Sequence, residues 1–344
     1  FATPATRPKA TYMTRPQRFL GKSISGPFTV PSGIVTTQPS IIQRIANDIP
    51  EIGVITTKSI GPVPRSGNRE PIYSQYAPGA FVNAVGLTNP GMEQAAKGLA
   101  QLQLPDDRFL LVSIFGGSVD EFVAVARLLA PYADGLELNL SCPHAKGYGM
   151  AMGQDPELVA EIVSAVKDAV SISVVPKLTP NTDRIGEIAT AAEEAGADAI
   201  CAINTVGPGA HTAHGHDVLS NGVGGLSGKG VLAVAQKCIR DIRAVTDLPI
   251  IGCGGVSSID DVTAMRSAGA EVIGVGSALT GMTTEEMKAY FADLSAAAEP
   301  GQEDLAEARV QYDLDMTFKP VTLVKTETVC ADIALMHFKE RFEI

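Results

Sequence analysis

A short segment, ELNLSCPH (137–144), brings a thiol, an imidazole and an amide together at the end of a predicted strand. Leucines occupy one parity of this segment and polar residues the other, and a strand sends the two parities to opposite faces. Cys142 can act as a soft acid or base, and His144 is a neighbour able to tune its pKa. Asn139 offers an amide that can hydrogen-bond the edge of a lactam or imide. The segment therefore predicts one wall of an active site.

Polar side chains also close three other predicted strands. Lys58, Lys177 and Asn204 each end a largely apolar run, and we assign them to the inward parity of their strands. For Asn204 this is the parity of Ile200 and Ala202. Buried lysine and asparagine are costly unless a partner satisfies them, either an internal ion pair or a bound ligand rich in hydrogen-bonding groups. Because four predicted strands, including the one that carries Asn139, end in an inward polar side chain, we favour a bound ligand over internal ion pairs.

Clusters of glycine mark a candidate phosphate site. Residues 252–255 (GCGG) and 274–277 (GVGS) end two consecutive predicted strands, and residues 224–228 (GGLSG) precede a predicted helix. In (β/α)8 barrels the loops after strands 7 and 8 commonly bind phosphate through backbone N–H groups. Ordinary turn glycines are the alternative for either cluster alone, whereas the pair at the expected barrel position favours phosphate.

The elements that must position these residues alternate between strands and helices. Helix-start signals occur at 118–121 (SVDE), at 283–286 (TTEE) and at Asp155-Pro156,. Eight strands separated by helices favour an α/β fold, a (β/α)8 TIM barrel, over an open six-stranded sheet. The apolar, β-branched runs that predict these strands lie near 28–33, 53–59, 110–116, 135–141, 172–178, 198–205, 248–254 and 271–276,.

We expect the barrel to occupy residues 1–300. Within it, residues 15–30 predict a short hairpin that plugs the end opposite to the active site. The connections 60–109 and 206–247 are longer than a helix requires, and because both follow strands they belong to the face that carries the chemistry. Residues 301–344 form a C-terminal extension that we expect to pack on the barrel or against a second subunit.

Composition narrows the classes of function. The chain of 344 residues is 45% hydrophobic and carries a net charge of −11, which disfavours nucleic acid and acidic membrane surfaces as partners,. No apolar run reaches the length of a membrane span. The five cysteines (142, 201, 238, 253 and 330) form no CxxC pair, so we expect a reducing cytoplasm and neither a disulfide framework nor a metal cluster,.

Two groups of residues with chemical potential receive structural interpretations. We expect Cys201, Cys238 and Cys253 to be small core residues,. The histidines at 211, 214 and 216 have no nearby carboxylate or cysteine to complete a metal site, so we expect a polar loop overhanging the active site and no metal,.

Together these motifs resemble the class 1 dihydroorotate dehydrogenase family and its relative, the pyrimidine-reducing domain of dihydropyrimidine dehydrogenase. The resemblance runs from about residue 17 to residue 295, and ELNLSCP is its most specific motif. The motifs are TKS (57–59), NAVGLTNPG (83–91), ELNLSCP (137–143), PKLTPN (176–181), INTVGPG (203–209), NGVGGLSG (221–228), IIGCGGVSS (250–258) and VGSAL (275–279).

The resemblance implies a noncovalent FMN cofactor and a pyrimidine-like substrate. It assigns the flavin to Lys58, Ser59 and Lys177 with Ser32, Gly33 and Asn139, and the phosphate to Gly228, Gly254, Gly255, Gly276 and Ser277. It assigns the substrate to Asn83, Asn139, Asn204 and Thr205, with the Gly86-Leu87 backbone near the carboxylate. Cys142 would remove the C5 proton while C6 loses hydride to flavin N5, with Lys58 and His144 as the other catalytic residues.

One residue departs from the dihydroorotate pattern and leaves the substrate open. The family usually has Asn after SCP, whereas this chain has His144, and its SCPH and GQDPEL (153–158) motifs match the dihydropyrimidine dehydrogenase domain. Dihydroorotate oxidation is the first reading, and chemistry on uracil-like or other lactam substrates is the second. A flavin-free barrel lyase or isomerase that uses the phosphate site, and a binding homologue without activity, are further alternatives.

The electron acceptor is expected to lie outside this chain, which has no nicotinamide fingerprint and no cysteine cluster,. The resemblance implies either a soluble acceptor such as fumarate or an iron–sulfur flavoprotein subunit, as in the class 1B branch. GQDPEL and GGLSG favour that branch. We also expect a homodimer, with the C-terminal extension as a candidate dimer arm.

Overall fold

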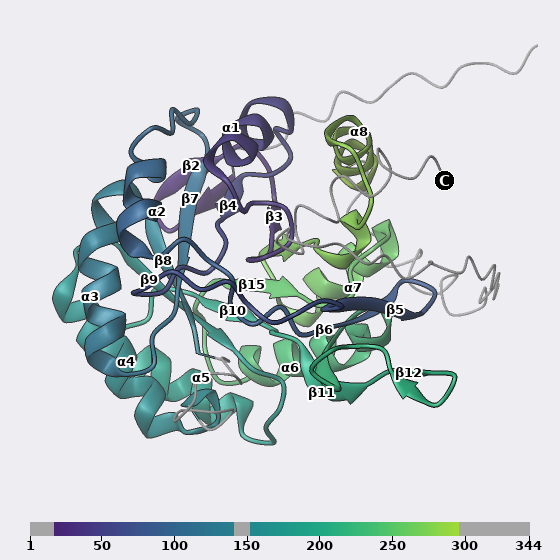
Figure 1. The fold of residues 1–344 in the computed structure, drawn as a ribbon. Helices are drawn as coiled ribbons and strands as arrows, with labels where there is room; N and C mark the ends of the chain where they lie inside the picture. Colours follow the sequence, from purple (N-terminus) through teal and green to yellow (C-terminus); the bar gives the residue numbers. More distant parts are fainter. Residues whose placement is uncertain (1–16, 141–151, 296–344) are drawn as a thin grey trace, which may run out of the picture.

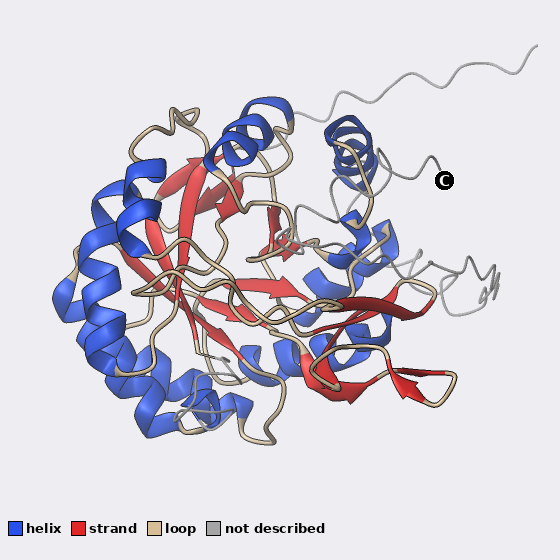
Figure 2. Ribbon diagram, in the orientation of Figure 1, coloured by secondary structure: helices blue, strands red, loops and turns tan. Residues whose placement is uncertain are grey.

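Eight parallel strands close into a barrel in the computed structural model, which describes residues 17–140 and 152–295. The strands follow one another around the barrel in chain order, and helices surround them (Figures 1 and 2). The predicted (β/α)8 barrel is therefore confirmed, with every predicted strand present in shorter form. The barrel strands are β3 (Phe28–Val30), β4 (Val54–Thr56), β7 (Phe109–Ile114), β8 (Gly135–Asn139), β9 (Ser173–Leu178), β10 (Ile200–Ala202), β15 (Ile250–Cys253) and β16 (Val272–Gly274).

The helices begin where their capping residues predict. Ser118 accepts a hydrogen bond from the Glu121 amide, and Asp155 accepts one from the Glu157 amide,. Within the described residues, no helix is both long enough and apolar enough to cross a membrane. The helices are α1 (Pro39–Asp48), α2 (Met92–Leu99), α3 (Val119–Leu129), α4 (Pro156–Ala169), α5 (Ile185–Glu194), α6 (Leu232–Arg243), α7 (Ile259–Ala268) and α8 (Thr284–Ser295).

A hairpin closes the N-terminal end of the barrel. It consists of β1 (Gln17–Phe19) and β2 (Lys22–Ile24), and its apolar side chains join the inward-facing residues of the barrel strands in one buried cluster. The Phe19 ring packs edge-on against Phe109 with the centroids 5.1 Å apart,. The predicted plug is confirmed, but it is shorter than 15–30 because residues 28–30 form the first barrel strand.

The two long connections build a small antiparallel sheet at the C-terminal ends of the strands. One connection provides β5 (Tyr73–Ala77) and β6 (Ala80–Asn83), and the other provides β11 (Val206–Ala210) and β14 (Val223–Gly228). The order is β11-β14-β6-β5, so the two connections pair through β14 and β6. Both connections lie on the predicted face, but their pairing was not predicted.

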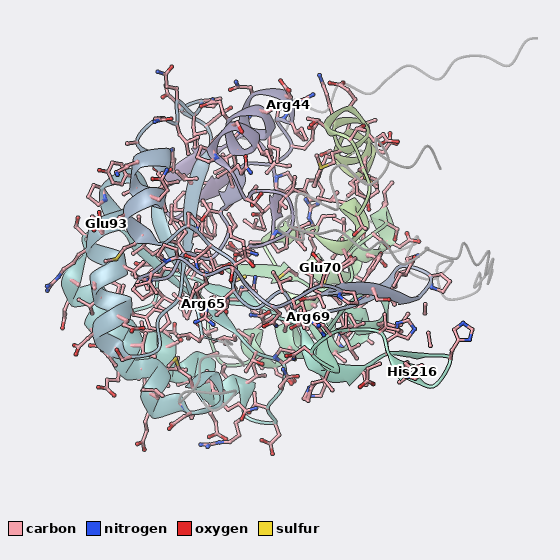
Figure 3. The ribbon with its side chains drawn as sticks, viewed as in Figure 1. Arg44, Arg65, Arg69, Glu70, Glu93 and His216 are labelled. Atoms are coloured by element: carbon pink, nitrogen blue, oxygen red, sulfur yellow. The ribbon has the colours of Figure 1, made fainter. Side chains whose placement is uncertain are left out.

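The histidine-rich loop forms a hairpin of β12 (Thr212–Ala213) and β13 (His216–Asp217). His214 and His216 are exposed, and Figure 3 shows His216 at the outer edge of the molecule, pointing away from the barrel. His211 lies 3.1 Å from the Ser74 hydroxyl through its Nδ1 atom, which ties this hairpin to β5. The expectation of a loop that overhangs the active site therefore applies to His211 at most.

Inward and outward residues alternate along the strands, as predicted for β8 and β9. For β10, the prediction that Ile200, Ala202 and Asn204 share the inward parity was wrong. Cys201 belongs to the cluster inside the barrel, whereas Ile200 and Ala202 pack outward toward the helices. Strand β10 ends at Ala202, so the alternation does not extend to Asn204. Cys201, Cys238 and Cys253 are all buried and unpaired, as predicted for core residues.

The hairpin plug predicts a large effect of one substitution on stability. Phe19→Ala should lower the free energy of unfolding by about 3–5 kcal/mol, because a fully enclosed aromatic ring is replaced by a cavity,. Chemical denaturation or thermal melting measures the loss. Val63→Ala is the control, since Val63 is 59% exposed and should change stability little,. Equal, small effects of both variants would show that the hairpin does not close the barrel.

Candidate active site

A chain of hydroxyl groups crosses the barrel at the C-terminal ends of its strands. The Ser32 and Ser59 hydroxyls lie 2.9 Å apart, as do those of Ser59 and Ser113. Ser113 donates to the Glu137 carboxylate at 2.8 Å. A carboxylate only accepts hydrogen bonds, so Ser113 uses its single proton here and Ser59 must donate to Ser113. The acid of β8 therefore sets the direction of the whole chain of hydrogen bonds.

Three of the predicted substrate-binding residues join this network. Asn139 donates through Nδ2 to the Ser59 hydroxyl at 3.1 Å. Asn204 donates through Nδ2 to Asn139 Oδ1 at 3.1 Å, and the Thr205 amide donates to Asn204 Oδ1 at 2.8 Å. The amide planes of Asn139 and Asn204 are thus fixed by their neighbours, and the structure brings both together with Thr205.

Glu137 also pairs with Lys177, the charged residue predicted for the next strand. The Lys177 ammonium lies 3.8 Å from Glu137 Oε1, and the two side chains are only 6% and 1% exposed. Burial by itself lowers the pKa of Lys177, but the negative charge of Glu137, with smaller contributions from Cys201 and Cys253, raises it above its usual value,. The internal ion pair that we weighed against a ligand is therefore present for Lys177.

Lys58 approaches the same region from β4. Its backbone N–H donates to the Thr36 carbonyl at 2.9 Å, which fixes the end of the strand. Gly33 faces it closely: a Cβ added at Gly33 would lie 3.5 Å from the Lys58 ammonium. The structure therefore places Ser32, Gly33, Lys58 and Ser59 side by side.

The glycine clusters surround a cavity of about 130 Å³ near the ends of β14, β15 and β16. Gly228, Gly255 and Ser277 line it. Gly254 lies beneath the lining, because a Cβ there would come within 2.7 Å of Ala235 on α6. A Cβ at Gly276 would approach Ile34 at 3.3 Å, so this glycine also packs against the barrel.

The remaining predicted substrate-binding residues lie on the small sheet and the loop after it. Asn83 ends β6 and donates to the Gly225 carbonyl at 3.3 Å. Gly86 and Leu87 both have positive φ angles, +82° and +59°. A Cβ at Gly86 would lie 2.7 Å from the Asn68 backbone nitrogen, so this turn requires glycine,. Cys142 and His144, the predicted base and its neighbour, lie outside the described residues.

The predicted site set left out two residues that organise the site. Glu137 alternates with the leucines of ELNL, so its inward direction was readable from the sequence, although its pairing with Lys177 was not. Asn181 accepts from the Gly207 amide at 2.8 Å and donates to the Thr205 carbonyl at 3.2 Å. It holds the loop after β10 in place and belongs to the PKLTPN motif.

Two exposed arginines lie on the loop between β4 and β5, where Figure 3 shows Arg65 and Arg69 in front of the barrel strands. The backbones of Arg65 and Asn89 exchange hydrogen bonds at 3.0 and 3.1 Å, which anchors this loop to the segment before α2. Both cations stand on the C-terminal face of a chain with a net charge of −11. Glu70, labelled near Arg69 in Figure 3, offsets part of this charge, so residues 65–70 carry two cations and one carboxylate and keep a positive balance that can attract a small anion,.

The chain is similar to proteins of known family. A family model described as "Dihydroorotate dehydrogenase" matches residues 16–290. A relative from Pyrococcus horikoshii is 42% identical over 266 residues, which cover 76% of this chain and 85% of the relative. A relative from Methanosarcina mazei is 43% identical over 261 residues, covering 75% and 82% of the two chains. Both are described as the catalytic subunit of dihydroorotate dehydrogenase B (NAD(+)).

The buried ion pair predicts a strong effect of Glu137→Gln. The variant keeps an oxygen that accepts from Ser113 but leaves the Lys177 ammonium buried without its counter-charge, so we expect a loss of about 3–5 kcal/mol in the free energy of unfolding. Adding Lys177→Met removes the stranded charge and should restore most of the stability. Glu187→Gln, which breaks an exposed pair with Arg184, should change stability little.

The same variant predicts a change in pH dependence. In the parent chain the raised pKa of Lys177 contributes stability below its unfolded value, and this is lost as the pH rises above about 10,. In Glu137→Gln, burial is unopposed and the folded pKa falls below the unfolded one, so stability rises with pH between the two values. The difference in melting temperature between parent and variant should shrink from pH 7 to pH 10. A constant difference would contradict the ion-pair assignment.

Proposed function

The chain belongs to the dihydroorotate dehydrogenase family, and from this premise we propose that it oxidises dihydroorotate to orotate with a flavin cofactor. The observation that carries the proposal is the fixed amide pair of Asn139 and Asn204. Each of these residues presents a preset amide edge, which suits the alternating N–H and C=O groups of a pyrimidine ring. The family assignment argues against the flavin-free lyase or isomerase and against a binding protein without activity.

The residues present fit FMN as the cofactor. The cavity lined by Gly228, Gly255 and Ser277 is bare of side chains at the glycines: a Cβ at Gly228 would overlap the Gly79 carbonyl, and one at Gly255 would lie 2.7 Å from the Gly228 carbonyl. Backbone N–H groups in a glycine-lined wall of this kind are the donors that commonly bind a phosphate. Gly254 and Gly276 shape this wall from behind, and the flavin ring is assigned to Ser32, Gly33, Lys58, Ser59, Asn139 and Lys177. When bound, FMN supplies the acceptor for the hydride that leaves C6 of the substrate.

The chain's own residues bind the substrate and move its proton. Asn83, Asn139, Asn204 and Thr205 hold the ring, while the Gly86-Leu87 backbone, in a turn that requires glycine, receives the carboxylate. Arg65 and Arg69 attract the anionic substrate to this face. The C5 proton is only weakly acidic, so its removal requires a positioned base.

Cys142 is the base that we assign to this step. In the sequence it follows β8, the strand that carries Glu137 and Asn139. Nearby lysine ammonium groups lower the pKa of a thiol and so increase the fraction of thiolate, which is the form that accepts a proton. Lys58 is the cation that we assign to this role, and His144 is the neighbour that adjusts the thiol.

A second candidate is chemistry on uracil-like or other lactam substrates, and His144 favours it. This residue stands where the dihydroorotate pattern has Asn, so a ring of amides around the substrate would be incomplete. The anionic substrate remains the first choice because the C-terminal face carries Arg65 and Arg69.

The assembly is proposed from the relatives, which are described as catalytic subunits. We propose that a partner subunit takes the electrons from this chain and passes them to NAD(+). An iron–sulfur flavoprotein is the class of protein that we assign to this role. We further propose a cytoplasmic homodimer, with an FMN-binding barrel over residues 1–300 and an extension over 301–344 that packs on the barrel or on the second subunit.

Substrate choice can be tested with the purified chain and a dye acceptor. Dihydroorotate should be oxidised at least about tenfold faster than dihydrouracil and dihydrothymine, which lack the carboxylate; a tenfold ratio corresponds to about 1.4 kcal/mol of transition-state binding. Initial rates at matched concentrations decide the question. Turnover of dihydrouracil without turnover of dihydroorotate would establish the second candidate.

The base assignment predicts a specific defect in Cys142→Ser. Serine holds its proton far more tightly than a thiol, so anaerobic bleaching of the flavin by substrate should slow at least about 100-fold, while bound FMN is retained. Cys238→Ala, a buried cysteine on α6, is the matched control and should bleach at the parent rate. Unchanged bleaching in Cys142→Ser would overturn the assignment.

A further inference from the structure

Lys229 is the charged residue among those that line the cavity at the ends of β14, β15 and β16. Its companions on the wall are neutral side chains and glycines, so any charge complementary to an anion in the cavity must come from Lys229 or from backbone amides. Besides Lys229, the lining residues on which the argument depends are Gly79, Gly228, Gly255, Ser257 and Ser277.

The fold fixes the position of this lysine at the rim. Its backbone N–H donates to the Gly79 carbonyl at 2.8 Å, in the turn between β5 and β6. The Lys229 Cγ and Cδ atoms lie 3.4 and 3.5 Å from the position that a Cβ at Gly79 would take. The stem of the side chain therefore packs against this turn at van der Waals distance.

The ammonium of Lys229 has no carboxylate partner among the described residues, unlike those of Lys22, Lys167 and Lys237. Ser257, another lining residue, donates to the Asp261 carboxylate from its amide at 2.8 Å and from its hydroxyl at 2.9 Å. An anion in the cavity therefore meets a fixed negative charge behind Ser257. Among the described lining residues, Lys229 supplies the one side-chain cation that can offset it.

We infer that Lys229 pairs with the phosphate of the flavin cofactor and makes the site select FMN over the unphosphorylated flavin. The inference rests on the proposed function, since it takes the cavity to be the cofactor's phosphate site. Lys229 was absent from the predicted binding residues, which relied on glycine backbone and Ser277. A phosphate monoester carries close to two negative charges at neutral pH, so a charge-assisted contact with Lys229 strengthens binding of the phosphorylated flavin alone.

The test compares FMN with riboflavin, which has the same ring system without the phosphate. The full chain is stripped of flavin and titrated with each compound, and quenching of flavin fluorescence gives the dissociation constant. Lys229→Gln keeps the Cγ and Cδ positions that lie over Gly79 but removes the charge. We expect its Kd for FMN to rise about 5-fold at low salt, and its Kd for riboflavin to stay unchanged. The effect on FMN should fade at 1 M salt, where exposed charges are screened.

Two further variants make the result specific. Lys229→Arg keeps the charge and should retain parent affinity for FMN. Lys237→Gln removes one positive charge from an exposed site on α6, where the lysine pairs with Asp241, and should leave both affinities unchanged. Equal FMN affinities in Lys229→Gln and the parent, or equal losses for FMN and riboflavin, would overturn the inference. A parent chain that binds neither flavin would instead overturn the proposed function.

Discussion

The buried ion pair between Glu137 and Lys177 is the interaction on which the rest of the site depends. Two charges so deeply enclosed are stable only when hydrogen bonds satisfy them, and Glu137 receives one from Ser113,. Because the carboxylate accepts and cannot donate, it orients Ser113, then Ser59, and through Ser59 the amide of Asn139,. One charge inside the barrel thereby determines which edges Asn139 and Asn204 present.

This arrangement explains why the barrel interior changes character along its axis. At the N-terminal end Phe19 and Ile24 of the hairpin fill the barrel with apolar side chains. At the other end, positions of the same inward parity carry Glu137 and Lys177. Packing in the apolar layer fixes the positions of the strands. The polar side chains further along the same strands are therefore held in fixed positions as well. The strands themselves thus place the groups that we assign to binding, and the loops add the glycine-lined cavity and the small sheet.

Local sequence patterns predicted most of the helices and strands. The features that they did not predict depend on pairing between residues that lie far apart in the sequence. Alternation in ELNL and the capping signals at Ser118 and Asp155 act within a few residues, so they are readable from the sequence. The pairing of Glu137 with Lys177 depends on the register between β8 and β9, which sets Asn139 opposite Lys177. The small sheet joins strands from two distant connections, and β14 contains too much glycine to be recognised as a strand,.

The acidic charge of the chain makes the local positive groups more important. A net charge of −11 opposes any anion, and both ligands that we assign to this face, a carboxylate and a phosphate, are anionic,. Cationic side chains lie on this face. They are Arg65 and Arg69 on one loop, Lys58 just after β4, and Lys229 at the rim of the glycine-lined cavity. Backbone amides alone would bind a phosphate with neutral dipoles, whereas a lysine at the rim adds a full charge where Asp261 would otherwise repel it,. Positive charge placed locally is thus the means by which we expect an acidic protein to bind anions on this face.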